Sequence, residues 1–444
     1  MSKEITFTQI DSFNESFYSK QDHLISQRSV MKNGILASSE NQQSTVINNP
    51  VFSIDLDTGK VANQKQSGRC WMFAALNTFR HRIEETFNIK DFELSQNFTF
   101  FWDKFEKANY FYENILDTAS EDLTSRKVAF LLQTPQQDGG QWDMLVAIIQ
   151  KYGIVPKTVM PETFSSSQSR DLNTYLNKKL RKDAVTLRTL VANKTTEEDI
   201  QQVKEEMLQE IYNLLATTLG TPPTTFDYSY VDTDGNYQLK RNLTPQLFYD
   251  EFVGRNLSDY VSVINAPTSD KPYNEVYTVE MLGNVVGGKE VRHLNVDIET
   301  FKKLAIDQLK MGEAVWYGCD VGQSSTRDSG IMATDIYSVE ETLDIDYSMT
   351  KAERLDYGES LMTHAMVITG VDLVDDKPTK WKVENSWGDK VGDKGYFVMS
   401  DDWLNEYTYQ IVINKKYLEK ELLDVIEADN VTTLAPWDPI GALA

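Results

Sequence analysis

The sequence contains only two cysteines, Cys70 and Cys319, among its 444 residues. Two cysteines cannot build the disulfide framework that small secreted proteins use, so we expect a reducing compartment. No apolar run approaches the ~18 residues that a membrane-spanning helix requires. The opening segment MSKEITFTQIDSF also lacks the apolar stretch and the small-residue cleavage site of a secretory signal. These absences together predict a soluble cytoplasmic protein.

Basic side chains are also scarce. Lysine and arginine total 44 against 67 aspartates and glutamates, which gives a formal net charge of −23. A surface this acidic repels the phosphates of nucleic acids and of anionic membranes, so neither is an expected partner. The 41% of hydrophobic and 25% of charged residues are typical of a globular protein. At ~150 residues per domain, the chain has room for two or three domains, or for one large core with insertions.

The hydrophobic pattern predicts helices in the first half of the chain. Apolar residues recur at helical spacing from Cys70 to Phe87, and a second helical stretch follows Gly140. Residues 165–215 predict two amphipathic helices, the first interrupted near Ala184. The pair Thr195 and Glu198 is typical of a capping box before the second helix.

Loops and strands are predicted elsewhere. The polar stretch 38–50 predicts a loop, and residues 225–240 predict a β-hairpin that turns at Asp234 and Gly235. An amphipathic helix over 298–311 is followed mainly by apolar, strand-like segments. Leading helices, a long helical insertion and trailing strands indicate an α+β fold.

One set of residues supplies the groups that a site with a nucleophilic cysteine requires. Cys70 lies at the predicted start of a helix, where the helix dipole favours a thiolate and lowers the thiol pKa. Gln64 lies on the loop that enters this helix, and its amide can donate to an oxyanion together with the backbone N–H of Cys70. His364 begins an apolar strand and can act as the base. Asn385 ends the next strand and can orient the imidazole, with Trp387 covering their hydrogen bond.

These blocks resemble a known family. QKQSGRCW, THAMVITG and ENSWG are similar to the three active-site blocks of papain-like cysteine peptidases, in the family's order Gln, Cys, His, Asn. DGGQWDMLVAIIQKYGIVPKTVMPE resembles the double-glycine segment of that superfamily. The long insertion, the C-terminal sequence APWDPIGALA and the lack of a signal or propeptide resemble the bleomycin hydrolase group, which includes bacterial aminopeptidase C.

The resemblance implies a papain-like core and assigns further residues. Gly139 and Gly140 would line the substrate cleft, and the C-terminal arm would end with Ala444 in the active site. It also implies a homohexamer that acts on peptide substrates. Arg69 replaces the serine that many relatives carry before the nucleophile, and Ser67 stands where secreted relatives have a disulfide cysteine.

The resemblance divides the chain into five segments. They are an N-terminal extension that packs on the core (1–60), a papain-like helical half with the nucleophile (61–160), a mainly helical insertion for oligomerisation (161–294), a papain-like β-rich half with the histidine and asparagine (295–435) and an extended C-terminal arm in the cleft (436–444).

The function predicted from these residues is that of a cysteine aminopeptidase of broad specificity. Such an enzyme would form a thioester with Cys70 and needs no cofactor or metal; no Cys/His cluster has metal-ligand spacing. Bleomycin-type amide hydrolysis is compatible with this chemistry. Two alternatives stay open, a papain-like endopeptidase and a non-catalytic binding scaffold. Cys319 is predicted to be a core residue, and His23, His81 and His293 to have surface or structural roles.

Overall fold

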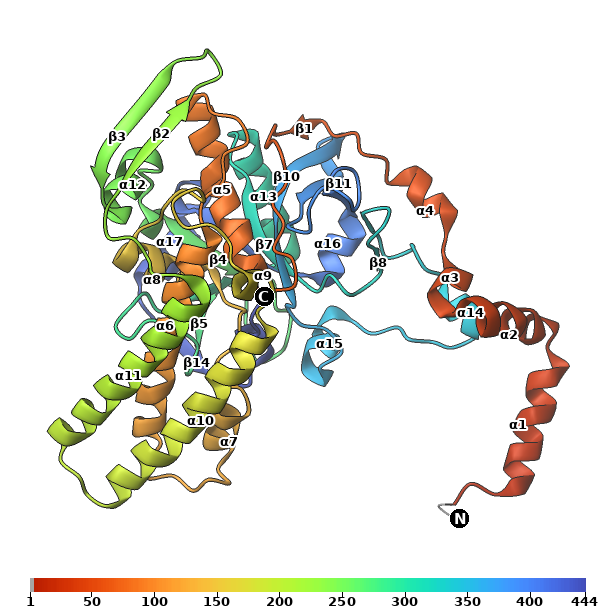
Figure 1. The fold of residues 1–444 in the computed structure, drawn as a ribbon. Coiled ribbons are helices and arrows are strands. Elements are labelled where there is room, and N and C mark those ends of the chain that lie inside the picture. The colour runs from red at the N-terminus through yellow and green to blue at the C-terminus, as the bar shows by residue number, and fades with distance from the viewer. Residues whose placement is uncertain (1–3) are drawn as a thin grey trace.

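The computed structural model describes residues 4–444. Four N-terminal helices form an arm that projects away from the rest of the molecule (Figure 1). They are α1 (Phe7–Ser19), α2 (Gln21–Asn33), α3 (Ile35–Ser39) and α4 (Gln42–Ile47). The loop prediction for 38–50 is therefore wrong for α4, whose N-cap Asn41 accepts a hydrogen bond from Gln43 N–H. Neither α1 nor α2 has a buried residue.

A bundle of helices forms one half of the body and contains the nucleophile. It comprises α5 (Cys70–Phe87), α6 (Gln96–Asp117), α7 (Arg126–Gln133) and α8 (Trp142–Tyr152). The predicted helix from Cys70 is confirmed, because its apolar face packs in the main core cluster. The predicted helix after Gly140 is confirmed as well and ends at Gly153, which has a positive φ of 71°.

The insertion is mainly helical, as expected. Its elements are α9 (Phe164–Ser167), α10 (Arg170–Ala192), α11 (Glu197–Leu219), the hairpin β2 (Phe226–Val231) and β3 (Tyr237–Leu243), α12 (Pro245–Phe252) and the 3-10 turn η1 (Leu257–Asp259). The hairpin is confirmed. However, α10 runs without a break through Ala184, which is buried. The cap of α11 is Thr196, which accepts from Asp199 N–H, so the predicted capping box at Thr195 is one residue out of register.

A twelve-stranded sheet forms the other half, in the order β14-β5-β6-β4-β13-β7-β10-β11-β12-β9-β8, with β1 paired to β10. Its strands are β1 (Ile54–Asp55), β4 (Tyr260–Ile264), β5 (Glu275–Val279), β6 (His293–Asn295), β7 (Val315–Cys319), β8 (Ser325–Thr326), β9 (Ile331–Met332), β10 (His364–Val374), β11 (Lys377–Glu384), β12 (Tyr396–Ser400), β13 (Thr408–Asn414) and β14 (Val431–Leu434). The α+β fold class is thus confirmed.

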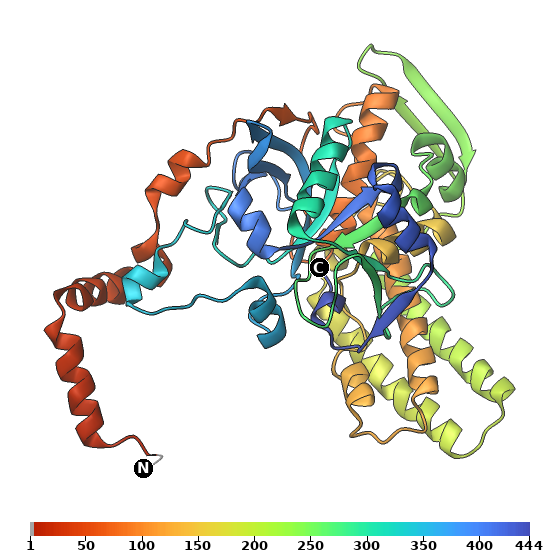
Figure 2. The ribbon, with the colours of Figure 1, turned by 180° about the vertical axis from the view of Figure 1, so that it is seen from behind.

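Most of the remaining helices lie around the sheet, whereas α14 packs on α2 and α3 of the N-terminal arm (Figure 2). They are α13 (Ile298–Lys310), α14 (Val339–Leu343), α15 (Lys351–Tyr357), α16 (Asp401–Tyr407), α17 (Lys420–Glu427) and the 3-10 turns η2 (Lys415–Tyr417) and η3 (Pro439–Gly441). The chain ends in the middle of the body (Figure 1). Helix α5 packs against β10, which brings the starts of these two elements to one site.

Candidate active site

The nucleophile candidate Cys70 is the first residue of α5, and only 2% of it is exposed. The helix begins here because Arg69 has a non-helical backbone and its carbonyl accepts from the N–H groups of Met72 and Phe73, both at 3.0 Å. The backbone N–H of Ala365 lies near enough to the Cys70 sulfur to lower the pKa of its thiol. Since Ala365 follows His364 in β10, the sulfur lies beside the base candidate.

Burial controls the protonation of both groups. It raises the pKa of the Cys70 thiol to about 11, although the N–H groups of Ala365, Trp71 and Cys70 lower it. It lowers the pKa of His364 to about 4, although the hydrogen bond to Asn385 raises it. The expected low thiol pKa is therefore not found. A helix N-terminus stabilises a thiolate, but the loss of hydration in this closed site outweighs it.

His364 and Asn385 are arranged as the sequence predicted. His364 Nε2 donates to Asn385 Oδ1 at 3.0 Å, which leaves Nδ1 free of this bond. Asn385 Oδ1 also accepts from Ser386 N–H at 2.7 Å. The ring centroid of Trp387 lies 4.9 Å from that of His364, and the two planes are 33° apart. The tryptophan therefore packs beside the imidazole.

Gln64 is a buried residue of the loop before α5. Its Nε2 donates to the carbonyl of Ser67 at 2.7 Å, and its backbone N–H donates to the carbonyl of Ser386 at 2.8 Å. The primary amide has two hydrogens on Nε2, so one of them remains for another acceptor. The structure thus ties the loop of Gln64 to the segment that follows Asn385.

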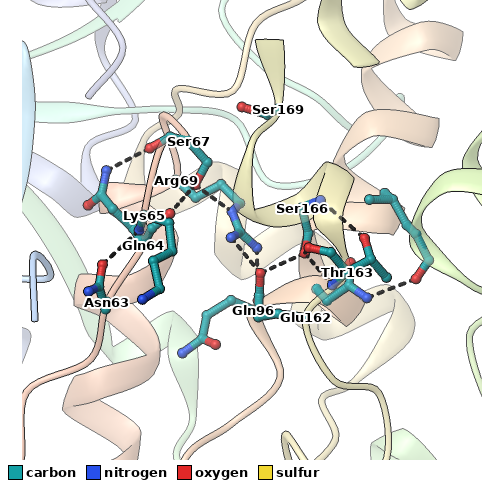
Figure 3. A network of polar contacts seen from close by, with 12 residues as sticks. Asn63, Gln64, Lys65, Ser67, Arg69, Gln96, Glu162, Thr163, Ser166 and Ser169 are labelled. Carbon is teal, nitrogen blue, oxygen red and sulfur yellow. Dashed lines mark hydrogen bonds and ion pairs between the residues drawn. The ribbon is translucent and has the colours of Figure 1, made fainter. Parts of the chain in front are cut away.

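Arg69 forms a buried ion pair directly before the nucleophile (Figure 3). Its guanidinium donates to both oxygens of Glu162, at 3.0 and 2.7 Å, and its Nε donates to Ser67 Oγ at 2.9 Å. It also lies over the rings of Phe73 and Phe100. Sequence reasoning did not identify Glu162, because no local pattern marks the distant partner of a charged residue.

A second buried charge holds the same loop. Asp138 accepts from Gly68 N–H at 2.9 Å and pairs with Lys104 Nζ at 2.7 Å. Burial raises the pKa of Asp138, but Lys104 and the hydrogen bonds outweigh burial and hold it well below its usual range. The carbonyl of Asp138 accepts from the indole N–H of Trp71 at 2.8 Å. The loop before Cys70 is therefore held by two anchors.

The C-terminal arm lies along the double glycine. Gly140 N–H donates to a carboxylate oxygen of Ala444 at 3.2 Å, and Ala444 N–H donates to the carbonyl of Gly140 at 3.4 Å. Gln141 Nε2 donates to the carbonyl of Ala442 at 2.6 Å. Ala444 is only 4% exposed and belongs to the same core cluster as Cys70.

Neither glycine position has room for a side chain. A Cβ on Gly139 would lie 2.8 Å from a carboxylate oxygen of Ala444, and a Cβ on Gly140 would lie 2.6 Å from the indole of Trp71. The first glycine therefore admits the arm, and the second admits the tryptophan that follows Cys70.

A family model described as the Peptidase C1-like family matches residues 4–441. The chain belongs to the Peptidase C1-like family. Among curated relatives of this Peptidase C1-like chain, Aminopeptidase C from Listeria innocua is 55% identical over 444 residues and covers 100% of both chains. Aminopeptidase C from Streptococcus thermophilus is 60% identical over 419 residues and covers 94% of each. The crystal structure of PepW from Lactobacillus rhamnosis HN001 is 66% identical, covers 100% of both chains and has a TM-score of 0.99.

The other cysteine and the other histidines are not part of the Cys70, His364 and Asn385 arrangement, although Cys319 is the cross-strand partner of His364. Cys319 is completely buried in β7, as predicted for a core residue. His23 pairs with Asp344, and His293 hydrogen-bonds to Ser262. Within residues 4–444, no three His, Cys, Asp or Glu side chains are grouped to hold a metal ion. None of the helices in the described part of the chain is both long and apolar enough to span a membrane.

Proposed function

We propose that this chain is a cysteine aminopeptidase that removes N-terminal residues from peptides. The observation that carries the proposal is the C-terminal arm, which ends at the double glycine beside a Cys, His and Asn constellation. The two relatives named Aminopeptidase C support the same activity. A cytoplasmic location agrees with the scarcity of cysteine, and we include it in the proposal.

The reaction begins with the sulfur of Cys70. As it attacks the carbonyl carbon of the first peptide bond, its proton moves to Nδ1 of His364, and the carbonyl oxygen gains the negative charge. The free hydrogen on Gln64 Nε2 and the N–H of Cys70 donate to this oxyanion. Because burial disfavours each charged group alone, the thiolate and the imidazolium are formed together, as a neutral pair, during attack.

The intermediate then collapses to a thioester. The carbon–nitrogen bond breaks, and His364 gives its proton to the leaving amine. His364 next accepts a proton from water, whose oxygen attacks the thioester carbonyl, and the carbon–sulfur bond breaks. The sulfur regains a proton from His364, and the free amino acid leaves. Asn385 holds the imidazole in the required orientation throughout.

Ala444 would set the exopeptidase character. No basic side chain of residues 4–444 forms an ion pair with its carboxylate, so this charge can pair with the α-ammonium of a substrate. Such a pair fixes the first residue and recognises no particular side chain, which agrees with broad specificity. Amides with an unblocked amine, including one of the bleomycin type, would fit the same arrangement.

The exposed arm supports a homohexamer. Phe7 is 86% exposed, and Phe13 and Met31 are also exposed, on helices that contribute no buried residue. Apolar surface of this kind is typical of a contact with another chain. Size-exclusion chromatography with light scattering should give a mass several times 50.8 kDa. A monomer at micromolar concentration would refute this assembly.

The test of the activity uses one fluorogenic amino-acid amide with a free amine and its N-blocked analogue. The free-amine amide should be hydrolysed and the blocked one should be a poor substrate. Equal hydrolysis of both would favour the endopeptidase alternative, and hydrolysis of neither would favour the scaffold.

A further inference from the structure

The loop of residues 64–69 contacts the start of the insertion through its backbone. Gln66 N–H donates to the carbonyl of Ser167 at 3.0 Å, and Ser169 N–H donates to the carbonyl of Gln66 at 3.4 Å. We call residues 162–169 the clamp segment. It joins the loop before Cys70 to α10, which starts directly afterwards at Arg170.

A chain of side-chain contacts runs from the clamp segment to Gln64 (Figure 3). Glu162 holds the guanidinium of Arg69 with both carboxylate oxygens. Arg69 Nε donates to Ser67 Oγ, and this hydroxyl donates to the carbonyl of Gln64 at 2.7 Å. The carbonyl of Ser67 in turn accepts from Gln64 Nε2. Both hydrogen bonds between Gln64 and Ser67 therefore depend on where Ser67 is held.

The ion pair is charged and largely shielded from water. The Arg69 side chain is 1% exposed and that of Glu162 is 20% exposed. Burial raises the pKa of Glu162, but Arg69 and Ser166 outweigh burial and lower it overall. Ser166 Oγ donates to Glu162 at 2.6 Å and fixes the carboxylate from the side of the insertion.

We propose that Glu162 is a positioning residue for the oxyanion donor, because through Arg69 and Ser67 it fixes the orientation of the Gln64 amide. This proposal rests on the oxyanion role of Gln64 proposed above. An oxyanion donor acts only if it stays within about 0.5 Å of its productive position, so the support behind it matters for turnover.

The nucleophile itself depends less on this support. Cys70 belongs to the first turn of α5, and the carbonyl of Arg69 is held by Met72 and Phe73 N–H groups of that turn. Helix α5 also packs against β10, which carries His364 and Ala365. Loss of the Glu162 charge should therefore disturb the oxyanion donor while the thiol stays in place.

The test is a double-mutant cycle of Glu162→Gln with Gln64→Ala. Glu162→Gln should lower kcat ~10-fold or more and change KM little, because an oxyanion donor acts in the transition state. In the Gln64→Ala background the same substitution should change kcat by less than about twofold. Alkylation of Cys70 by iodoacetamide forms no oxyanion, so its rate should be the same in Glu162→Gln and the unmodified enzyme.

Two further variants keep the test decisive if Glu162→Gln folds poorly. Glu162→Asp retains the charge and should lose less kcat. Asp183→Asn is the matched control, since Asp183 is a buried carboxylate of α10 that accepts a hydrogen bond from Tyr112 Oη at 2.6 Å and lies outside the network. Asp183→Asn should lower the free energy of unfolding. Any effect that it has on kcat should be the same in the unmodified enzyme and in the Gln64→Ala background.

Each outcome is decisive. An unchanged kcat in both Glu162 variants, a loss that persists fully in the Gln64→Ala background, or a parallel loss of alkylation rate would overturn the positioning role. If Gln64→Ala alone leaves kcat unchanged, the oxyanion role of Gln64 fails first, and that result is separate from the failure of Glu162.

Discussion

Deletion of residues 441–444 should convert the enzyme from an aminopeptidase into one that accepts blocked or internal bonds. The deletion removes the carboxylate of Ala444 and the three hydrogen bonds that hold the arm on Gly140 and Gln141. It also removes the arm from beside Gly139 and Gly140, so under the proposed function a longer peptide should be able to lie across Cys70.

The magnitude follows from the lost charge pair. Two unit charges ~4 Å apart attract by about 4 kcal/mol at an effective dielectric constant of about 20. Desolvation of the α-ammonium and the carboxylate reduces this, so we expect a net loss of about 2–3 kcal/mol. At about 1.4 kcal/mol per factor of ten, kcat/KM on a free-amine substrate should fall roughly 30- to 150-fold.

The assay compares kcat/KM for free-amine and N-blocked forms of one peptide. The ratio of kcat/KM on the free-amine form to kcat/KM on the N-blocked form should fall by at least roughly 30- to 150-fold. The reason is that activity on the N-blocked form should rise while activity on the free-amine form falls. A milder variant adds one alanine after Ala444, which moves the carboxylate and leaves the arm in place. It should weaken free-amine hydrolysis without creating activity on blocked substrates. An unchanged ratio in the deletion variant would refute the role of the arm.

Three other predictions concern the site residues and the buried His293. Gln64→Ala should lower kcat ~100-fold or more with little change in KM, measured by steady-state kinetics. Asn385→Ala should reduce kcat less than His364→Ala, because the asparagine orients the ring and transfers no proton; equal losses would contradict this order. Burial lowers the pKa of His364 and of His293 from 6.5 to about 4, so the unfolded chain binds these protons first as the pH falls. Each histidine should therefore cost about 3 kcal/mol of stability between pH 6.5 and 4, and a pH-independent urea midpoint over that window would contradict both shifts.

Helices and strands could be predicted where the spacing of apolar residues determines the secondary structure. The helix from Cys70 and the hairpin at Asp234 follow from spacing and turn residues. The loop prediction missed α4 because polar residues near Asn41 are common in both caps and loops. The predicted break near Ala184 is wrong, because Ala184 is buried and the buried apolar face of α10 continues through it.

The site was predictable in its residues but not in its environment. His364 and Asn385 could be paired from the spacing of two adjacent strands. The pKa of Cys70 could not be predicted, since it depends on how many distant segments cover the sulfur. Glu162 was equally hidden, because its partner Arg69 is brought to it only by the tertiary fold.

The measurement that tests the central claim most directly is hydrolysis of a free-amine fluorogenic amide by Cys70→Ser, with Cys319→Ser as the matched control. Both cysteines are buried, and Cys319 is the cross-strand partner of His364, but only Cys70 begins a helix. Circular dichroism should show that both variants are folded. The account predicts that Cys319→Ser turns the substrate over at the rate of the unmodified enzyme and that Cys70→Ser has no measurable turnover. Substantial activity in a folded Cys70→Ser variant would contradict the account.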